Sequence, residues 1–290
     1  MTFFALTALT NTITSFFLGL LVLRKKTPAH MGKDFARFCV TATLWSLAYF
    51  IWQHAATPAS ALFWCQLLTC FSSFLPLTQL IFICNLLNIK HHPLFTVFLY
   101  GFSCLTAVLS FTPLMIAGVR PMAVFPFWPH AGSLYGGYLL IWMALIVYGQ
   151  VLLITRYRTA PPPLKTLLYY LIIATLVGYL GGATNYPLWF GLPILPYGNI
   201  GVTFYVIIFA YAIARQRVLN IRIVRTEALV FLIFAILLID ALAVTSVAQA
   251  VVRGVLLGLF ALVAFKFVRS LLDLDAANRQ LEQDKRTLIE

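Results

Sequence analysis

The sequence predicts an all-α fold: a polytopic transmembrane helix bundle of about nine spans that ends in a cytoplasmic coiled-coil helix. The first observation behind this is composition, because 62% of the 290 residues are hydrophobic and 10% are charged, whereas soluble domains have roughly 45–50% and 25%. The second is the placement of the 20 Lys+Arg residues, which gather in alternate connections between apolar runs. Such placement is an orientation signal in membrane proteins. The net charge of +12 is therefore weak evidence for nucleic-acid binding, and no nucleic-acid partner is expected.

The spans follow from the length of the apolar runs. A bilayer core of about 30 Å requires about 20 mostly apolar residues per helix. Nine such runs can be placed, at residues 3–23, 38–56, 61–87, 94–116, 134–154, 166–183, 197–214, 228–247 and 251–268. The last two are separated by a short connection, so a re-entrant hairpin is an alternative to two full spans.

The basic residues predict the orientation. All of them except Arg120 and Arg253 lie in the first, third, fifth and seventh connections, or at and beyond the end of the last run. Because positively charged connections remain in the cytoplasm, the N-terminus is predicted outside and the C-terminus inside. No basic segment precedes the first run, so we expect it to stay as a span rather than to be removed as a signal peptide.

Asp240 is the acidic residue that these boundaries place well inside a span. A charge at membrane depth costs about 2.5–3.5 kcal/mol on insertion scales unless it is paired or faces water. Arg253, on the other side of a turn near Gln249, lies within reach, so we predict a structural ion pair between the two. A proton- or ligand-responsive switch at Asp240 is the functional alternative.

Two stretches on the predicted outer side, residues 120–130 and 185–193, are dense in proline and aromatic residues. Proline lacks a backbone donor, so structured loops are expected there rather than helices or strands. Each aromatic residue alone is typical of an interfacial belt. Together with nearby polar side chains, they favour an outward-facing pocket for a mainly apolar ligand. The candidate ligand-binding residues are Trp52, His54, Trp128, His130, Asn185 and Trp189.

The sequence contains no sign of catalysis or metal binding. The five cysteines lie inside apolar runs without metal-ligand spacing, so neither a metal site nor a cofactor is expected. No Ser/His/Asp arrangement, carboxylate pair, Walker loop or HExxH motif occurs, and no catalytic residue is predicted in this chain. Gly178, Gly181 and Gly182 instead predict close packing of the sixth run against a neighbouring helix.

The C-terminal tail has a heptad pattern. Leu274, Leu281 and Leu288 recur every seven residues, and Asn278 occupies the position at which a buried Asn favours a parallel two-stranded coiled coil. We therefore predict a homodimer through this helix, with an ordinary amphipathic juxtamembrane helix as the alternative. The predicted dimer seam consists of Leu271, Leu274, Asn278, Leu281 and Leu288.

The region 134–224 resembles the N-terminal seven-helix sensor region of bacterial histidine kinases. The resemblance rests on Arg156-Tyr157-Arg158, on Tyr169-Tyr170-Leu171-Ile172-Ile173, on Asn185-Tyr186-Pro187, on Tyr197-Gly198-Asn199 and on the block 209–221. That block resembles a "YAI-x-R-x-R-L-x-D-I" ending of the seventh helix, with Val218 where Leu is usual and Asn220 where Asp is usual. The resemblance covers about the first 225 residues. The two further runs resemble a nine-span subgroup that includes autoinducer receptors.

The resemblance implies a seven-helix membrane sensor region at 1–225, two further transmembrane helices at 226–268 and a cytoplasmic signalling coiled coil at 269–290. It implies the sensory receptor region of a two-component histidine kinase in the bacterial inner (cytoplasmic) membrane, with a small hydrophobic or amphipathic ligand and a downstream kinase domain or response-regulator pathway as partners. No histidine follows His130, and no glycine-rich nucleotide-binding segment or GGDEF-like run occurs. The chain is thus expected to be a sensory fragment or a stand-alone receptor. A small-molecule transporter and the sensor region of a diguanylate cyclase are the alternatives.

Overall fold

The computed structural model describes residues 2–24, 29–90, 92–213, 255 and 258 of the chain. Contacts group Thr2–Val218 into one compact unit. The predicted Asp240–Arg253 ion pair lies outside the described residues. The same holds for the predicted dimer seam of Leu271, Leu274, Asn278, Leu281 and Leu288.

The described residues are mostly helical, and each of the first seven apolar runs contains helix. Pro58–Leu87 counts as one of five helices long and apolar enough to cross a membrane, while Pro93–Leu109 and Tyr197–Phe209 are shorter apolar helices. The expectation of a helical membrane bundle is confirmed at this level. The helices are α1 Phe3–Arg24, α2 Ala29–Trp52, α3 Pro58–Ser72, α4 Leu75–Leu87, α5 Pro93–Leu109, α6 Tyr135–Thr159, α7 Pro162–Ala183, α8 Tyr186–Trp189, the 3-10 turn η1 Tyr197–Asn199 and α9 Ile200–Ile213.

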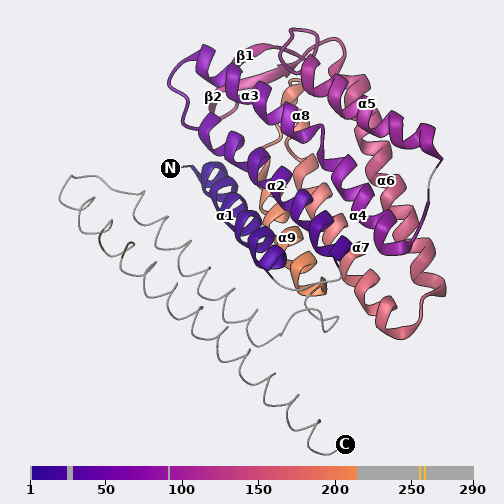
Figure 1. Ribbon diagram of the computed structural model, residues 1–290. Coiled ribbons are helices and arrows are strands. Elements are labelled where there is room, and N and C mark those ends of the chain that lie inside the picture. Colours follow the sequence, from indigo (N-terminus) through magenta and orange to yellow (C-terminus); the bar gives the residue numbers. More distant parts are fainter. Residues whose placement is uncertain (1, 25–28, 91, 214–254, 256–257, 259–290) are drawn as a thin grey trace, which may run out of the picture. The chain divides into compact units, whose positions relative to one another are not determined.

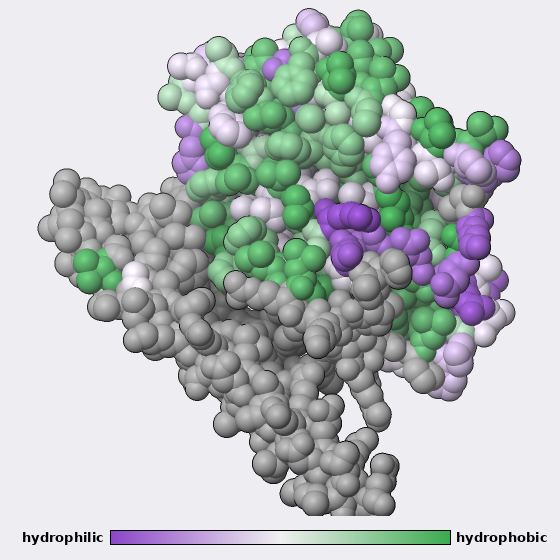
Figure 2. Space-filling view, viewed as in Figure 1, coloured by the Kyte–Doolittle hydropathy of each residue, from purple (hydrophilic) through white to green (hydrophobic). Residues whose placement is uncertain are grey.

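Large apolar side chains point outward along the helices. Leu140 of α6 is 74% exposed, and Leu94 and Val108, near the two ends of α5, are 71% and 70% exposed. Figure 2 shows hydrophobic residues over most of the described face, with hydrophilic residues confined to a few patches. Lipid, rather than water, is the solvent in which such a surface is stable.

The third run is broken into two helices, α3 and α4. Ser73 and Phe74 separate them, and Pro76 stands in the first turn of α4. Proline has no N–H to donate to the carbonyl four residues earlier, and its ring collides with that carbonyl in a continuous helix. The carbonyl left without an intrahelical donor is that of Ser72.

Residues 120–130 and 185–193 were expected to form loops without strands or helices, and this expectation is wrong. Residues 116–131 form a β-hairpin, in which β1 Ile116–Met122 pairs antiparallel with β2 Phe125–Ala131. In a two-stranded ribbon, alternate N–H groups point away from the partner strand, so prolines at those positions remove no ladder bond. The register is irregular at two places, between Ile116 and Gly118 and between Arg120 and Met122, and Pro121 lies in the second of them. The second segment contains the short helix α8, because Pro187 falls in a first turn, where proline is tolerated. The fold is therefore mostly helical rather than all-α.

The hairpin lies at one end of the bundle, together with α8 and the start of α3 (Figure 1), and this end is called the hairpin end below. The ring of Phe4, near the start of α1, lies 5.0 Å from that of Phe125 in β2, which places the start of the chain there as well.

The opposite end contains a buried carboxylate that the sequence boundaries had placed in a connection. Helix α2 begins at Ala29, earlier than the expected residue 38, so Asp34 lies inside it and is 3% exposed. Its Oδ1 accepts from Arg37 Nη1 at 2.7 Å, and its Oδ2 accepts from Asn85 Nδ2 at 2.6 Å. The pair with Asn85 joins α2 to α4, and this end is called the Asp34 end.

Helix α7 packs closely against η1 and α9, as the glycines predict. A Cβ added to Gly181 would lie 2.3 Å from the carbonyl oxygen of Gly198, and one added to Gly178 would lie 2.5 Å from Cβ of Tyr205. A Cβ on Gly182 would meet Val202 at an ordinary 3.6 Å. Only the first two glycines are therefore required for the close approach.

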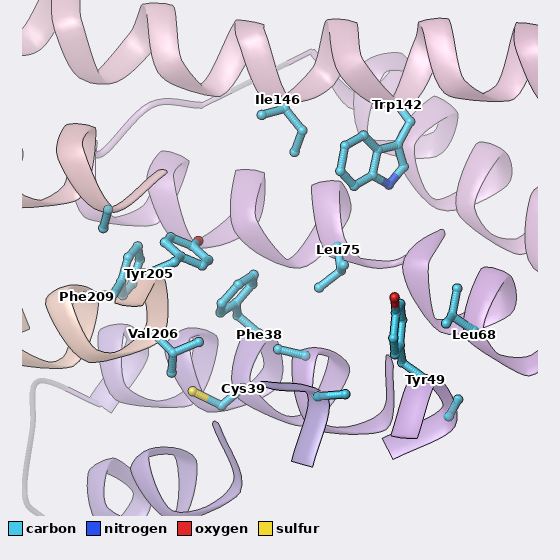
Figure 3. Close-up of a cluster of buried hydrophobic side chains, with 14 of the residues drawn as sticks. Phe38, Cys39, Tyr49, Leu68, Leu75, Trp142, Ile146, Tyr205, Val206 and Phe209 are labelled. Atoms are coloured by element: carbon cyan, nitrogen blue, oxygen red, sulfur yellow. The ribbon is translucent and has the colours of Figure 1, made fainter. Parts of the chain in front are cut away.

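The core toward the Asp34 end is aromatic. Figure 3 shows Tyr205 and Phe209 of α9 beside Phe38 of α2. The ring of Phe209 lies 5.0 Å from that of Phe35, 6.0 Å from that of Phe38 and 4.9 Å from that of Phe82. Phe209 thus joins α9 to α2 and α4, in addition to the packing of α9 against α7 and α1.

Candidate functional site

A small cavity lies inside the hairpin end of the bundle. Its volume is about 30 Å³, enough for about two water molecules. Helices α2, α3, α6, α7 and α8, strand β2 and Asn185 contribute to its wall. The lining residues are Trp45, Tyr49, Trp52, Leu68, Thr69, Ser72, Trp128, Tyr135, Gly182, Asn185, Tyr186 and Trp189.

The structure brings together four of the six residues predicted to bind a ligand. Trp52, Trp128, Asn185 and Trp189 all line this cavity and are all buried. The two histidines do not line it. His54 is exposed, with Nδ1 2.9 Å from the carbonyl oxygen of Phe50, one helical turn earlier. His130 is half-buried in β2, beside Gly118 of β1.

A chain of hydrogen bonds leads from the cavity wall to the start of α9. The Tyr49 hydroxyl donates to Asn185 Oδ1 at 3.0 Å. Asn185 Nδ2 donates to the carbonyl oxygen of Gly182 at 2.9 Å and to Asn199 Oδ1 at 3.2 Å. Asn185 is 6% exposed and Asn199 is 3% exposed, so both amides are shielded from competing solvent. Asn199 immediately precedes α9.

Aromatic pairs form much of the wall. The rings of Tyr135 and Trp189 stack with centroids 4.3 Å apart and an interplanar angle of 4°. Trp52 meets Trp128 edge to face at 4.7 Å, and its indole N–H donates to the carbonyl oxygen of Phe127 at 2.8 Å. That bond ties α2 to the hairpin.

One fully buried donor of the wall has no partner in the described part of the chain. Trp128 is 1% exposed, and its Nε1 is buried without a hydrogen-bond acceptor. Thr69 Oγ1, also in the wall, donates to the carbonyl oxygen of Cys65 at 3.0 Å.

The break between α3 and α4 lies at the cavity wall. Ser72 Oγ accepts from the Tyr138 hydroxyl at 3.2 Å, and the Ser72 carbonyl oxygen accepts from Trp142 Nε1 at 2.9 Å. Both donors belong to α6. The carbonyl that Pro76 deprives of a helical partner is thus satisfied from a neighbouring helix, as membrane interiors require.

The lining carries no charged side chain. Among the residues that the structure describes, no three His, Cys, Asp or Glu side chains gather as they would around a metal ion. The arrangement is suited to non-covalent binding of a small uncharged molecule by aromatic surfaces and a few polar groups.

The sequence prediction missed several residues of the wall and its support, namely Trp45, Tyr49, Ser72, Tyr135 and Trp142, and it missed the bond between Asp34 and Asn85. A serine four residues before a proline inside an apolar run is a usable signal for an exposed carbonyl. For the others the sequence offers no local signal, because their partners lie on distant helices.

These observations define a multi-pass membrane protein with a small cavity of uncharged lining at one end of a helical bundle. A family model described as the N-terminal 7TM region of histidine kinase matches residues 7–222. The chain belongs to that family, which confirms the resemblance predicted from the sequence. The nine-span subgroup stays a prediction. No match was found among curated proteins or among solved structures.

Proposed function

We propose that this chain is the sensory region of a two-component histidine kinase in the bacterial inner membrane. A small hydrophobic or amphipathic ligand binds in the cavity at the hairpin end, through Trp52, Trp128, Asn185 and Trp189. Binding changes the position of α9 and, through it, a dimeric cytoplasmic helix. The family assignment supports the sensory role over that of a carrier or of a cyclase sensor.

The observation that carries the proposal is the double role of Asn185. Its side chain lines the cavity and also donates to Asn199 at the start of α9. A ligand that takes a hydrogen bond from Asn185, or displaces Tyr49 from it, alters the bond between Asn185 and Asn199 at the start of α9. Occupancy of the cavity and the position of the last described helix are therefore coupled through a single amide.

The size of the cavity suggests how a ligand would produce a signal. At about 30 Å³ it is far smaller than the roughly 300–1,000 Å³ of sites for drug-sized ligands. A ligand larger than two waters must therefore bind better to a state in which the wall has moved. Differential affinity for two states is the condition for a ligand to shift an equilibrium between them.

The charge distribution supports an orientation with the hairpin end outside. Arg24, Lys33, Lys90, Arg156 and Lys165 lie at helix termini or in connections of the Asp34 end, whereas Arg120 lies in the hairpin. The cytoplasmic side of membrane proteins carries the excess of basic residues. The cavity would then face the periplasmic half of the membrane.

The experiment joins residues 1–290 to a reporter kinase domain and measures autophosphorylation in membranes. Asn199→Ala removes the link to α9 but leaves every cavity-lining side chain in place. We expect it to change basal activity about fivefold or more, at the lower end of allosteric coupling energies, at wild-type membrane abundance. Gln53→Ala, a polar replacement at the same end but outside the cavity wall, is the matched control. Wild-type activity of Asn199→Ala at equal abundance would contradict the proposal.

A further inference from the structure

We propose that the outward face of α2 binds an anionic phospholipid, whose phosphate is held by Lys33 and Arg37 at the Asp34 end. One acyl chain lies along Val40, Leu44 and Leu47 of the same face. This inference goes beyond the proposed sensory function, because it concerns the lipid around the bundle and not the cavity at the hairpin end.

The five residues form one stripe along α2. They follow one another at intervals of four, three, four and three residues, which is the spacing of positions on one face of an α-helix. Lys33 is exposed, the side chain of Arg37 is 64% exposed, Val40 is 56% exposed, and Leu44 and Leu47 are each 37% exposed. Figure 2 shows a hydrophilic patch between α2 and α4, bordered by hydrophobic residues. The stripe is thus cationic toward the Asp34 end and apolar beyond it.

The length of the stripe matches one leaflet of a bilayer. Arg37 and Leu47 are ten residues apart, which is about 15 Å along a helix axis. The hydrocarbon core is about 30 Å thick, so each leaflet contributes about 15 Å. A lipid whose phosphate lies at Arg37 can therefore extend one acyl chain along the whole apolar part of the stripe.

Arg37 is held in position by the buried carboxylate of Asp34. Its Nη1 donates to Asp34 Oδ1 at 2.7 Å, and Asn85 Nδ2 donates to Asp34 Oδ2 at 2.6 Å. A guanidinium has five N–H donors, and Asp34 is the only acceptor that Arg37 meets in the described part of the chain. The remaining donors, on a mostly exposed side chain, can bond to a phosphate, for which the planar guanidinium is well suited.

The charge at the stripe favours an anionic headgroup. Asp34 is the only acidic residue among those that the structure describes, it is buried, and both of its oxygens are hydrogen-bonded. The exposed surface of the stripe therefore has two cationic side chains and no anionic one. A zwitterionic headgroup brings an ammonium group that these cations repel. An anionic headgroup gains about fivefold in affinity for each Lys or Arg near the membrane surface.

The test measures lipid binding to the full 290-residue chain by native mass spectrometry, without a kinase domain. Purified protein in detergent is titrated with phosphatidylglycerol, which is anionic, or with phosphatidylcholine, which is zwitterionic and has the same long acyl chains. We expect the first phosphatidylglycerol to bind with a Kd about 25-fold lower than that of phosphatidylcholine, as the product of two basic residues.

The variants remove one charge at a time. Arg37→Gln and Lys33→Gln should each raise the Kd of phosphatidylglycerol about fivefold and leave that of phosphatidylcholine unchanged. Arg156→Gln, at an exposed position near the end of α6 and outside the stripe, changes the net charge equally and should leave both values unchanged. The ion pair of Arg37 is exposed and contributes little to stability, and Lys33→Gln provides a second test if Arg37→Gln does not fold.

Two further probes separate a lipid from a free phosphate. Inorganic phosphate has the anionic group alone, and phosphatidylglycerol with six-carbon chains has the headgroup but cannot cover the apolar part of the stripe. At the same concentration as the long-chain lipid, neither probe should displace it.

Three results would overturn the proposal. Equal Kd values for the two long-chain lipids would show that another segment of the chain or a second copy covers the stripe. Equal effects of Arg37→Gln and Arg156→Gln would show a general attraction to the basic end without a site. Displacement by inorganic phosphate would show that the acyl chain contributes nothing. The reporter-kinase measurement on Asn199→Ala is independent of all three, so failure of lipid binding and failure of the sensory function are distinguishable.

Discussion

The indole N–H of Trp142 donates to the carbonyl oxygen of Ser72 at 2.9 Å, and this is the carbonyl that Pro76 leaves without an intrahelical donor. The bond joins α6 to the third apolar run at the break between α3 and α4. Because Ser72 also lines the cavity, the bond supports the wall on the side of α6. It makes the break in the third span a defined structural feature rather than a weakness.

The first prediction concerns this bond. Trp142→Phe keeps a smaller aromatic ring but leaves a buried carbonyl unpaired, which costs about 1–3 kcal/mol. Thermal unfolding of the purified protein in detergent should show the loss, whereas Trp64→Phe should not. Pro76→Ala restores an N–H that can bond to Ser72, so the double variant should be less destabilised than the sum of the two single variants. Strict additivity would show that the two residues do not share this carbonyl.

The second prediction ranks the two partners of Asp34. The ion pair with Arg37 involves a side chain that is 64% exposed, so it should contribute at most about 1 kcal/mol and weaken with salt. The bond from Asn85 is a charge-assisted link between two helices, worth about 1.5–3 kcal/mol. Unfolding by denaturant at low and high salt should show Asn85→Ala to be more damaging than Arg37→Ala, with salt altering only the effect of Arg37→Ala. The reverse order would mean that the ion pair dominates.

The third prediction concerns the contact of α7 with η1, the turn that leads into α9. Gly181→Ala places a methyl group 2.3 Å from the Gly198 carbonyl oxygen, and overpacking of this kind costs about 1–3 kcal/mol. Gly137→Ala, in α6, meets nothing within 4 Å and should be neutral or stabilise by up to about 1 kcal/mol. Membrane abundance and thermal stability would distinguish them. Equal effects would argue against close packing at Gly181.

The fourth prediction concerns orientation. Val124 lies in the turn of the hairpin and is 66% exposed, whereas Thr159 ends α6 at the opposite end. In intact cells stripped of their outer membrane, Val124→Cys should react with a membrane-impermeant maleimide and Thr159→Cys should not. Thr159→Cys should react only after the membrane is permeabilised. The opposite pattern would invert the predicted topology, and the unsubstituted protein corrects for its own cysteines.

The fifth prediction concerns the tail. If the leucines and Asn278 form a parallel dimer seam, Leu281→Cys should cross-link between two copies much more readily than Gln283→Cys, which falls on another helix face. Oxidative cross-linking in membranes, followed by non-reducing electrophoresis, measures the ratio. Similar yields at both positions would leave no support for the coiled coil.

The helical membrane bundle and the helical character of the first seven apolar runs could be predicted from the sequence, because the cost of exposing polar backbone to lipid acts on every segment separately. The hydropathy of each apolar run therefore indicates a membrane environment whatever helices pack beside it. The two ends of the second span were less well defined. Lys33, Asp34 and Arg37 look like a polar connection by composition, and only packing against Asn85 shows that Asp34 belongs to a helix.

The candidate site was predicted in part, because some of its features are local properties of the sequence and others depend on tertiary packing. Aromatic residues near span ends identified Trp52, Trp128 and Trp189, since span ends are a local property. That they meet each other, and that His54 and His130 stay outside the cavity wall, depends on how the helices and the hairpin are arranged. The hairpin itself was missed because prolines exclude strands only where their missing N–H would have been used, which depends on the partner strand.

The sequence by itself thus determined that the chain is a helical membrane protein of the kinase-sensor type. Hydropathy, the placement of basic residues and motif spacing are all properties of the sequence that do not depend on how the helices pack. The tertiary structure alone decided which polar groups are paired. Tyr49 and Asn185 are separated by 136 positions in the chain yet lie 3.0 Å apart, while Trp128 Nε1 is left without an acceptor in the described part of the chain. A hydrogen bond requires two atoms to meet at a fixed distance and angle, and in the bilayer that meeting is arranged by the packing of whole helices, which no single segment encodes.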